Sequence, residues 1–315
     1  MKHEKFWAYI AFATVCVVWG TTYLGIAIAI ETIPPLLMTG TRFTIAGVLL
    51  LAFAKFRGDK IPMDRKTLGN LALIGFLMVG VGNLAVVWAE KWVPSGMAAL
   101  FVATAPFWMA ILELFRPGGE RVSLRSGIGM FVGFLGVAML VTPGGAGSAW
   151  GVGLIGGAVA IQFGGLAWQY GSMRGKYSIK HVPLVVSSGM QMLFGGVIVS
   201  IVGFAIGEGP RYVLTPRTFA ALAYLTIFGS VIAYSAYVFA LAHLRTSVSS
   251  LYAYVNPVVA VFLGWLVLSE PLTWVSLVAM AVILAGVALV QSASWQKAAP
   301  AAAAPEPVAV KERAA

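Results

Sequence analysis

Apolar residues occur along this chain in ten long stretches that are separated by short polar breaks. The stretches cover residues 6–28, 34–54, 69–90, 95–115, 124–142, 151–171, 183–206, 218–240, 247–268 and 273–292. About 20 consecutive apolar residues form a helix long enough to cross the hydrocarbon core of a bilayer. The breaks contain turn residues, as in "KWVPSG" and "TPGGAGSAW". The pattern therefore predicts an all-α polytopic membrane protein with ten transmembrane helices.

The composition supports this prediction, because 60% of the residues are hydrophobic and only 10% are charged. Soluble domains carry about 25% charged residues. The first stretch could be taken for a cleaved signal peptide, but its length and the nine spans after it favour a retained first helix. The single cysteine, Cys16, lies in that stretch, so neither a disulfide framework nor a cysteine metal site is expected.

The basic residues predict how the chain is oriented. With the N-terminus in the cytoplasm, all but four of the 21 Lys and Arg residues fall on the cytoplasmic side. The exceptions are Lys91, Arg211 and Arg217 on the outer side, and Arg42 within a span. This bias favours a multi-pass protein with cytoplasmic N- and C-termini. Because orientation accounts for the basic clusters, we expect no nucleic-acid partner; the expected partners are the lipid bilayer and a small-molecule substrate.

The chain also repeats itself. The matched positions are Pro106 with Pro257, Glu120 with Glu270 after a one-residue slip, Pro35 with Pro183, and Gly47 with Gly195. Each repeat holds five spans, an odd number, so the second repeat must enter the membrane inverted relative to the first. We therefore expect a first repeat over residues 6–142 and a second over 151–292. The Ala- and Pro-rich segment 296–315 is expected to be a disordered cytoplasmic tail.

Catalytic chemistry is poorly supported by the sequence. The three histidines, His3, His181 and His243, fall at predicted cytoplasmic ends or loops. No paired carboxylates at mid-depth and no zinc spacing are found, so no catalytic residue, metal site or cofactor is predicted. The Gly-Lys pair in "MRGKY" lacks the other residues of a phosphate-binding loop, which argues against ATP-driven transport.

Charged residues inside the spans have two interpretations each. Arg42 could line a vestibule as a substrate-binding or helix-tying charge, since charges at membrane depth usually face a cavity or a partner. It could instead extend to the interface, or pair with Glu31 or Glu90. Glu113 could pair with nearby arginines at the interface or couple transport to protons. No carboxylate is placed at mid-membrane, so the coupling ion is not predicted.

Polar and aromatic side chains within the spans predict a central cavity. The proposed lining is Trp19, Asn83, Trp88, Trp168, Tyr234, Tyr237 and Asn256. Aromatic faces bind apolar or cationic groups, while amides and hydroxyls would orient the substrate. The alternative for the aromatic residues is an interfacial belt. Pro106 and Pro257 interrupt the fourth and ninth spans, and they predict matching kinks beside the cavity.

These features resemble the EamA-type transporters of the drug/metabolite transporter superfamily over residues 6–292. The segments that carry the resemblance are "WGTTYLGIAIAI", "PPLLMTGTRFTIAG", "PSGMAALFVATAPFW" and "YAYVNPVVAVFLGWLVLSEPLT". The resemblance implies a secondary transporter that exports small metabolites such as amino acids, or drugs, from the bacterial inner (plasma) membrane. It does not determine the substrate, direction, coupling ion or oligomeric state. The alternatives are a non-transporting membrane scaffold and a membrane-embedded enzyme.

Overall fold

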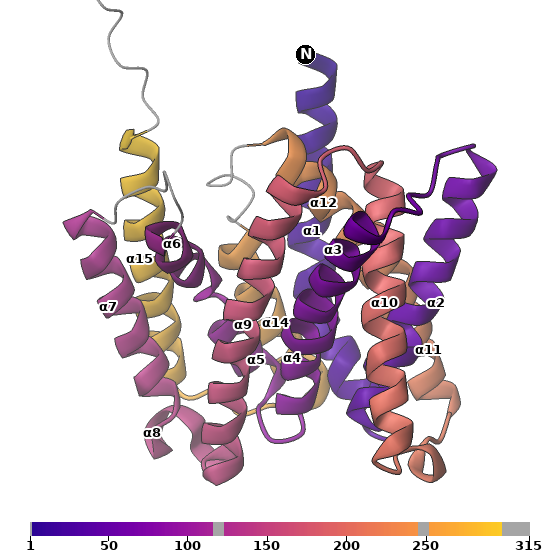
Figure 1. The fold of residues 1–315 in the computed structure, drawn as a ribbon. Coiled ribbons are helices and arrows are strands. Elements are labelled where there is room, and N and C mark those ends of the chain that lie inside the picture. The colour runs from indigo at the N-terminus through magenta and orange to yellow at the C-terminus, as the bar shows by residue number, and fades with distance from the viewer. Residues whose placement is uncertain (1, 116–122, 245–251, 298–315) are drawn as a thin grey trace, which may run out of the picture.

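The computed structural model describes residues 2–115, 123–244 and 252–297, which are almost entirely helical (Figure 1). In chain order the elements are α1 (Lys2–Ala29), α2 (Pro35–Phe56), α3 (Arg65–Gly75), η1 (Phe76–Asn83), α4 (Leu84–Ala89), α5 (Ser95–Val102), α6 (Ala105–Phe115), α7 (Leu124–Leu140), α8 (Pro143–Ala146), η2 (Gly147–Ala149), α9 (Val152–Ser178), α10 (Leu184–Ala205), η3 (Gly209–Arg211), α11 (Pro216–Tyr224), η4 (Leu225–Ile232), α12 (Ala233–His243), α14 (Tyr252–Leu268) and α15 (Trp274–Lys297).

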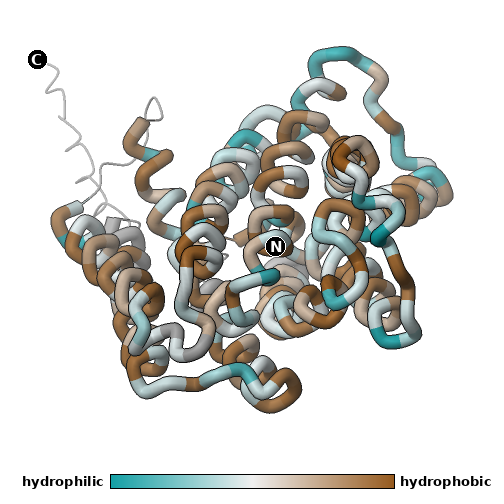
Figure 2. Tube along the Cα trace, turned by 90° about the horizontal axis from the view of Figure 1, so that it is seen from below, coloured by the Kyte–Doolittle hydropathy of each residue, from teal (hydrophilic) through white to brown (hydrophobic). Residues whose placement is uncertain are grey.

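The prediction of an all-helical membrane protein is confirmed. Seven continuous helical runs of the described chain are long and apolar enough to cross a membrane. Three shorter apolar helices, Leu124–Leu140, Val255–Leu268 and Trp274–Val290, occupy the remaining predicted spans. Figure 2 shows hydrophobic residues along the helices and the most hydrophilic ones in connecting segments and at helix ends. Glu120, and the expected tail from residue 298 onward, lie outside the described residues.

The two halves of the chain are arranged as inverted repeats. In Figure 1, α1 descends from the N-terminal face of the molecule, whereas α9, the first long helix of the second half, starts at the opposite face and ascends. The same inversion places α2 and α10, each 22 residues long, side by side and antiparallel. Helices α7 and α15 form a second such pair at the far edge of the bundle (Figure 1).

Glycines allow the backbones of α2 and α10 to touch. A Cβ atom at Gly47 would lie 2.6 Å from the backbone nitrogen of Leu193, and one at Gly196 would lie 2.5 Å from that of Thr44. Gly47 and Gly196 occupy equivalent places in helices of equal length, so Gly196 rather than Gly195 is the partner of Gly47. Gly195 instead faces the carbonyl oxygen of Gly75 in α3. Small residues at such crossings permit the close packing that holds helices together in lipid.

Replacing Gly47 by leucine is expected to destabilise the bundle by at least about 1–3 kcal/mol, because overpacking here must move backbone rather than a flexible side chain. The thermal unfolding midpoint of the protein in detergent measures the effect. Gly156→Leu is the matched control, because nothing lies within 4 Å of a Cβ at Gly156. Equal midpoints for the two variants would contradict this account of the α2–α10 contact.

Two carboxylates of the second half cap helices of the first half. Glu208 accepts a hydrogen bond from the backbone N–H of Leu37 at 2.9 Å. Glu270 accepts from the N–H groups of Ser95 at 2.7 Å and of Gly96 at 3.1 Å. The first N–H groups of a helix have no partner within the helix, and its N-terminus carries a partial positive charge. These caps therefore tie the two halves together at the face opposite the N-terminus.

Replacing Glu270 by glutamine is expected to lower the free energy of unfolding by about 1.5–3 kcal/mol, the usual contribution of hydrogen bonds to a charged group. Chemical denaturation of the purified protein, followed by tryptophan fluorescence, measures the change. Glu31→Gln is the control, because the Glu31 side chain is 42% exposed and pairs with Arg217 at the surface. A control variant as unstable as Glu270→Gln would refute the capping role.

Each half contains a π-helical segment at the same place. Segment η1 in the third span and segment η4 in the eighth are both eight residues long and lie 149 residues apart. Within each one a glycine, Gly80 or Gly229, occupies the equivalent position. A π-helical turn interrupts the regular α-helical hydrogen bonds and is frequent at functional sites. The symmetric placement of two such segments therefore indicates a functional site in the space between them.

Candidate functional site

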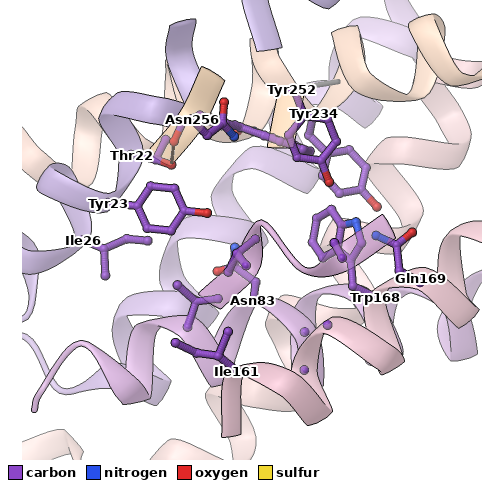
Figure 3. Close-up of a pocket in the computed structure, with 18 of the residues that line it drawn as sticks. Thr22, Tyr23, Ile26, Asn83, Ile161, Trp168, Gln169, Tyr234, Tyr252 and Asn256 are labelled. Atoms are coloured by element: carbon purple, nitrogen blue, oxygen red, sulfur yellow. Dashed lines mark hydrogen bonds between the residues drawn. The ribbon is translucent and has the colours of Figure 1, made fainter. Parts of the chain in front are cut away.

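A cavity of about 90 Å³ lies between the two halves. Its lining residues come from α1, α2, η1, α4, α5 and α6 of the first half and from α9, η4, α12 and α14 of the second. Figure 3 shows Tyr23, Asn83 and Trp168 pointing into this common space. A cavity of that size with some polar groups in its lining holds several water molecules or a small organic group. Its position at the interface of inverted repeats is where transporters of this architecture bind substrate.

Aromatic rings form one wall of the cavity. The ring centroid of Trp19 lies 5.8 Å from that of Trp168, 5.0 Å from that of Tyr237 and 5.3 Å from that of Tyr252. Tyr234 packs edge-on against Trp168 at 6.0 Å. Trp19 and Trp168 occupy equivalent positions in the two repeats, 149 residues apart. The wall therefore offers apolar ring faces contributed by both halves.

The indole of Trp19 is fixed by the π-helical segment η4. Its Nε1–H donates to the carbonyl oxygen of Gly229 at 3.1 Å. Thr22 lies one turn further along α1 and is close to Gly229. A Cβ atom at Gly229 would be 2.9 Å from the methyl group of Thr22. The glycine therefore lets α1 and η4 approach closely, and the carbonyl of the irregular turn holds the tryptophan in place.

Arg42 supplies the charge of the cavity. Its side chain is only 2% exposed, and its Nε donates to the Ser230 hydroxyl at 2.8 Å. Its Nη1 is buried without a hydrogen-bond partner. Glu31, one of the partners considered from the sequence, instead pairs with Arg217 at 3.0 Å. Within the described residues no carboxylate lies within 4.0 Å of the Arg42 guanidinium, so a donor remains free to bind a ligand.

The equivalent place in the second repeat carries a neutral group. Gln191, 149 residues after Arg42, accepts a hydrogen bond from the Tyr234 hydroxyl at 2.7 Å. Its amide nitrogen donates to the Ser187 hydroxyl at 2.7 Å. The polar groups on this side are therefore engaged with one another, whereas Arg42 keeps an unused donor. A bound molecule would meet positive charge on only one side.

The two asparagines of the cavity differ in their bonding. The Oδ1 of Asn83, at the end of η1, is buried without a hydrogen-bond partner. The amide of Asn256 faces two carbonyl oxygens, and with its nitrogen turned toward them it donates to Cys16 at 2.9 Å and to Tyr252 at 3.2 Å. Asn256 therefore ties α14 to α1, whereas Asn83 offers a free acceptor. Buried polar atoms without partners are rare in folded proteins, and at a cavity they indicate a missing ligand or water.

Most of the sequence-predicted lining residues are brought together here. Those that line the cavity are Trp19, Asn83, Trp168, Tyr234, Asn256 and the charged Arg42. Tyr237 is not a lining residue, but it packs against Trp19, which is. Trp88 is placed elsewhere: it is 37% exposed and packs against Trp92, with ring centroids 4.7 Å apart. A tryptophan pair near the end of a span is typical of the interfacial belt.

The two prolines have different surroundings. The fourth span is interrupted at Ala103 and Thr104, between α5 and α6, directly before Pro106. Gln162 of α9 bridges this break, because its Oε1 accepts from Thr104 at 2.9 Å and its amide nitrogen donates to the Phe101 carbonyl at 3.1 Å. In the ninth span, α14 continues through Pro257 without interruption. The interruption therefore belongs to one repeat rather than to both.

Several lining residues were not among those selected from the sequence. Thr22 and Tyr23 follow Trp19 by three and four residues, and Tyr252 precedes Asn256 by four. Positions three and four apart share one face of a helix. The signal that could have found them was therefore the helical periodicity around the two residues already chosen.

The comparisons with known proteins agree with this architecture. The profile of the EamA-like transporter family matches residues 6–142 and 155–292. The chain is 39% identical over 277 residues, 87% of each chain, to the "Uncharacterized inner membrane transporter YedA" of Escherichia coli (strain K12). It is 22% identical over 267 residues to the "Uncharacterized transporter YoaV" of Bacillus subtilis (strain 168), covering 82% of this chain and 88% of that one. A solved crystal structure shares the fold with a TM-score of 0.67 at 20% identity, over 93% of this chain and 99% of its own.

Proposed function

We propose that this chain, which belongs to the EamA-like transporter family, is a secondary transporter that exports small metabolites such as amino acids, or drugs, by alternating access around the central cavity. The family membership makes it a membrane transporter rather than an enzyme. The observation that carries the finer proposal is Arg42, which is buried in the cavity with one guanidinium nitrogen unpartnered. A charge kept at membrane depth without a counter-ion is costly unless a ligand uses it.

The chemistry of the cavity favours a substrate with a carboxylate and an apolar part. Arg42 binds carboxylates through its guanidinium nitrogens. The free Oδ1 of Asn83 accepts a hydrogen bond, for which an ammonium group is a suitable donor. The aromatic wall around Trp19 receives the apolar part. Amino acids with apolar side chains combine these three features, whereas a purely cationic drug would be repelled by Arg42, the charged residue among the described lining.

Alternating access requires the two halves to move around a fixed site. The interruptions that allow such movement lie next to the cavity: η1 and η4 in the third and eighth spans, and the break at Ala103 and Thr104 in the fourth. Since the lining comes from both halves, a rocking motion opens the cavity first to one face and then to the other. We place the protein in the bacterial inner membrane with both termini in the cytoplasm, as the distribution of Lys and Arg favours.

Flux into proteoliposomes tests the proposed function. Purified protein is reconstituted and challenged with a gradient of each member of a panel: leucine, phenylalanine, glutamate, a dicarboxylate and a quaternary ammonium dye. We expect protein-dependent flux of the apolar amino acids and little flux of the dye. Folded protein that moves no amino acid of the panel would contradict the proposed substrate class, and no flux of any compound would contradict transport itself.

A further inference from the structure

Glu90 is a second buried ionisable group, near the cavity but outside its lining. It follows the last residue of α4 at the face opposite the N-terminus, and it is 9% exposed. Both oxygens of its carboxyl group are buried without a hydrogen-bond partner. An ionised carboxylate without partners is very unfavourable away from water, and such a group takes up a proton instead. The geometry is therefore that of a neutral carboxylic acid.

The groups that face Glu90 come from several elements. Arg42 of α2, Tyr23 of α1 and Glu270, before α15, all lie close enough to act on it electrostatically. Tyr224 of α11 acts in the same way on Arg42. Helix α9, which also packs against α4, contributes glycines to this contact and no titratable group there. Arg42 favours a negative Glu90, whereas burial and the negative charge of Glu270 oppose it.

Arg42 connects Glu90 to the cavity. It lines the cavity, and α2 packs against α4, the helix that ends at Glu90, so Arg42 is close enough to act on both the ligand space and the buried carboxyl group. In the present arrangement Glu90 does not pair with Arg42 within 4.0 Å. Two anions, a substrate carboxylate and an ionised Glu90, would therefore compete for the same cation. Only one of them can neutralise Arg42. If the substrate carboxylate binds Arg42, Glu90 must take up a proton; if Glu90 is ionised, the substrate must dissociate.

We propose that Glu90 is a proton-binding site whose charge decides whether Arg42 is free to hold a substrate carboxylate. When a proton from water adds to a carboxylate oxygen of Glu90, an O–H bond forms, the acid becomes neutral and Arg42 is released. When that O–H bond breaks, the proton returns to water and the carboxylate is drawn to Arg42. One proton therefore travels with each substrate carboxylate. Export is then driven by accumulated substrate and opposed by an inward proton gradient.

The proposal rests on the proposed function, but its central test needs no substrate. Proteoliposomes adsorbed on a solid-supported membrane receive a pH jump in metabolite-free buffer, and the displaced charge is recorded. We expect a transient current from the natural protein and its loss in Glu90→Gln. The matched control, Glu31→Gln, changes an exposed carboxylate and should keep the current. An unchanged current in Glu90→Gln, or no current from the natural protein, would overturn the proposal.

A second measurement covers the case in which Glu90→Gln does not fold. Infrared difference spectra of the natural protein, taken on raising the pH, should show loss of a protonated carboxylic acid band. Glu90→Asp should shift that band; a spectrum with no such band would also overturn the proposal. A pH-jump current without flux of any panel compound would refute the proposed function and leave the proton site standing. Flux of leucine without a pH-jump current would refute the proton site and leave the proposed function standing.

Discussion

Replacement of Arg42 by glutamine is expected to lower the rate of amino-acid flux by at least roughly tenfold. Arg42 is the charged residue of the described cavity lining. In the proposed function its free Nη1 binds the substrate carboxylate, and glutamine removes that charged donor. A hydrogen bond to a charged group contributes about 1.5–3 kcal/mol, and 1.4 kcal/mol corresponds to a factor of ten in affinity. The initial rate of leucine or phenylalanine uptake into proteoliposomes, at equal amounts of reconstituted protein, measures the loss.

Arg217→Gln is the matched control for this experiment. It makes the same chemical change at a surface pair with Glu31, in which the Arg217 side chain is 57% exposed. Exposed ion pairs contribute about 0–1 kcal/mol, so flux should remain close to that of the natural protein. Arg42→Lys should retain part of the activity, because lysine keeps the charge but not the paired donors of the guanidinium. Equal flux from Arg42→Gln and Arg217→Gln would remove Arg42 from the site.

Replacement of Trp19 by phenylalanine is expected to be the second most damaging change. It removes the N–H that donates to the Gly229 carbonyl and reduces contact with Trp168, Tyr237 and Tyr252. A buried carbonyl left without its donor costs about 1–3 kcal/mol. We expect flux to fall roughly tenfold, with a Michaelis constant that rises more for phenylalanine than for glutamate, because the aromatic wall holds the apolar part of the substrate.

Trp88→Phe provides the control, because both tryptophans lie within predicted spans but only Trp19 lines the cavity. Trp88 contacts Trp92 and is partly exposed, so its replacement should leave the rate and the Michaelis constant nearly unchanged. If Trp88→Phe impaired transport as much as Trp19→Phe, the functional site would extend beyond the cavity described here.

The contrast between these two tryptophans shows where inference from the sequence reaches its limit. Both are large aromatic residues inside an apolar stretch. Trp88 lies nearer the end of its stretch than Trp19 does, but position along a stretch does not tell which side of the helix faces a cavity. The difference arises because position 19 faces the second half of the chain, where Trp168 and Gly229 meet it. The face that a residue presents depends on which other helices surround it, and those helices are more than one hundred residues away in sequence.

The position and partners of Arg42 were likewise left open by the sequence. The sequence allowed interfacial placement, pairing with Glu31 or Glu90, or a place in the cavity, and each was chemically reasonable. The folded chain places Arg217 beside Glu31 and places Ser230 beside Arg42. Both contacts join the two repeats, so neither could be derived from one repeat alone.

The sequence by itself determined that this is a helical membrane protein with inverted repeats. The lipid bilayer requires apolar spans and a charge bias between them, and both can be seen in short stretches of sequence. In lipid every span must satisfy its backbone within about 20 apolar residues, and charge bias orients the whole chain. Only the tertiary structure decided which polar groups keep free hydrogen-bonding atoms, as Arg42 and Asn83 do. It also decided that the repeats pair through Gly47 and Gly196. Satisfaction of a polar group and close backbone contact are properties of several helices together, and no stretch of sequence contains them.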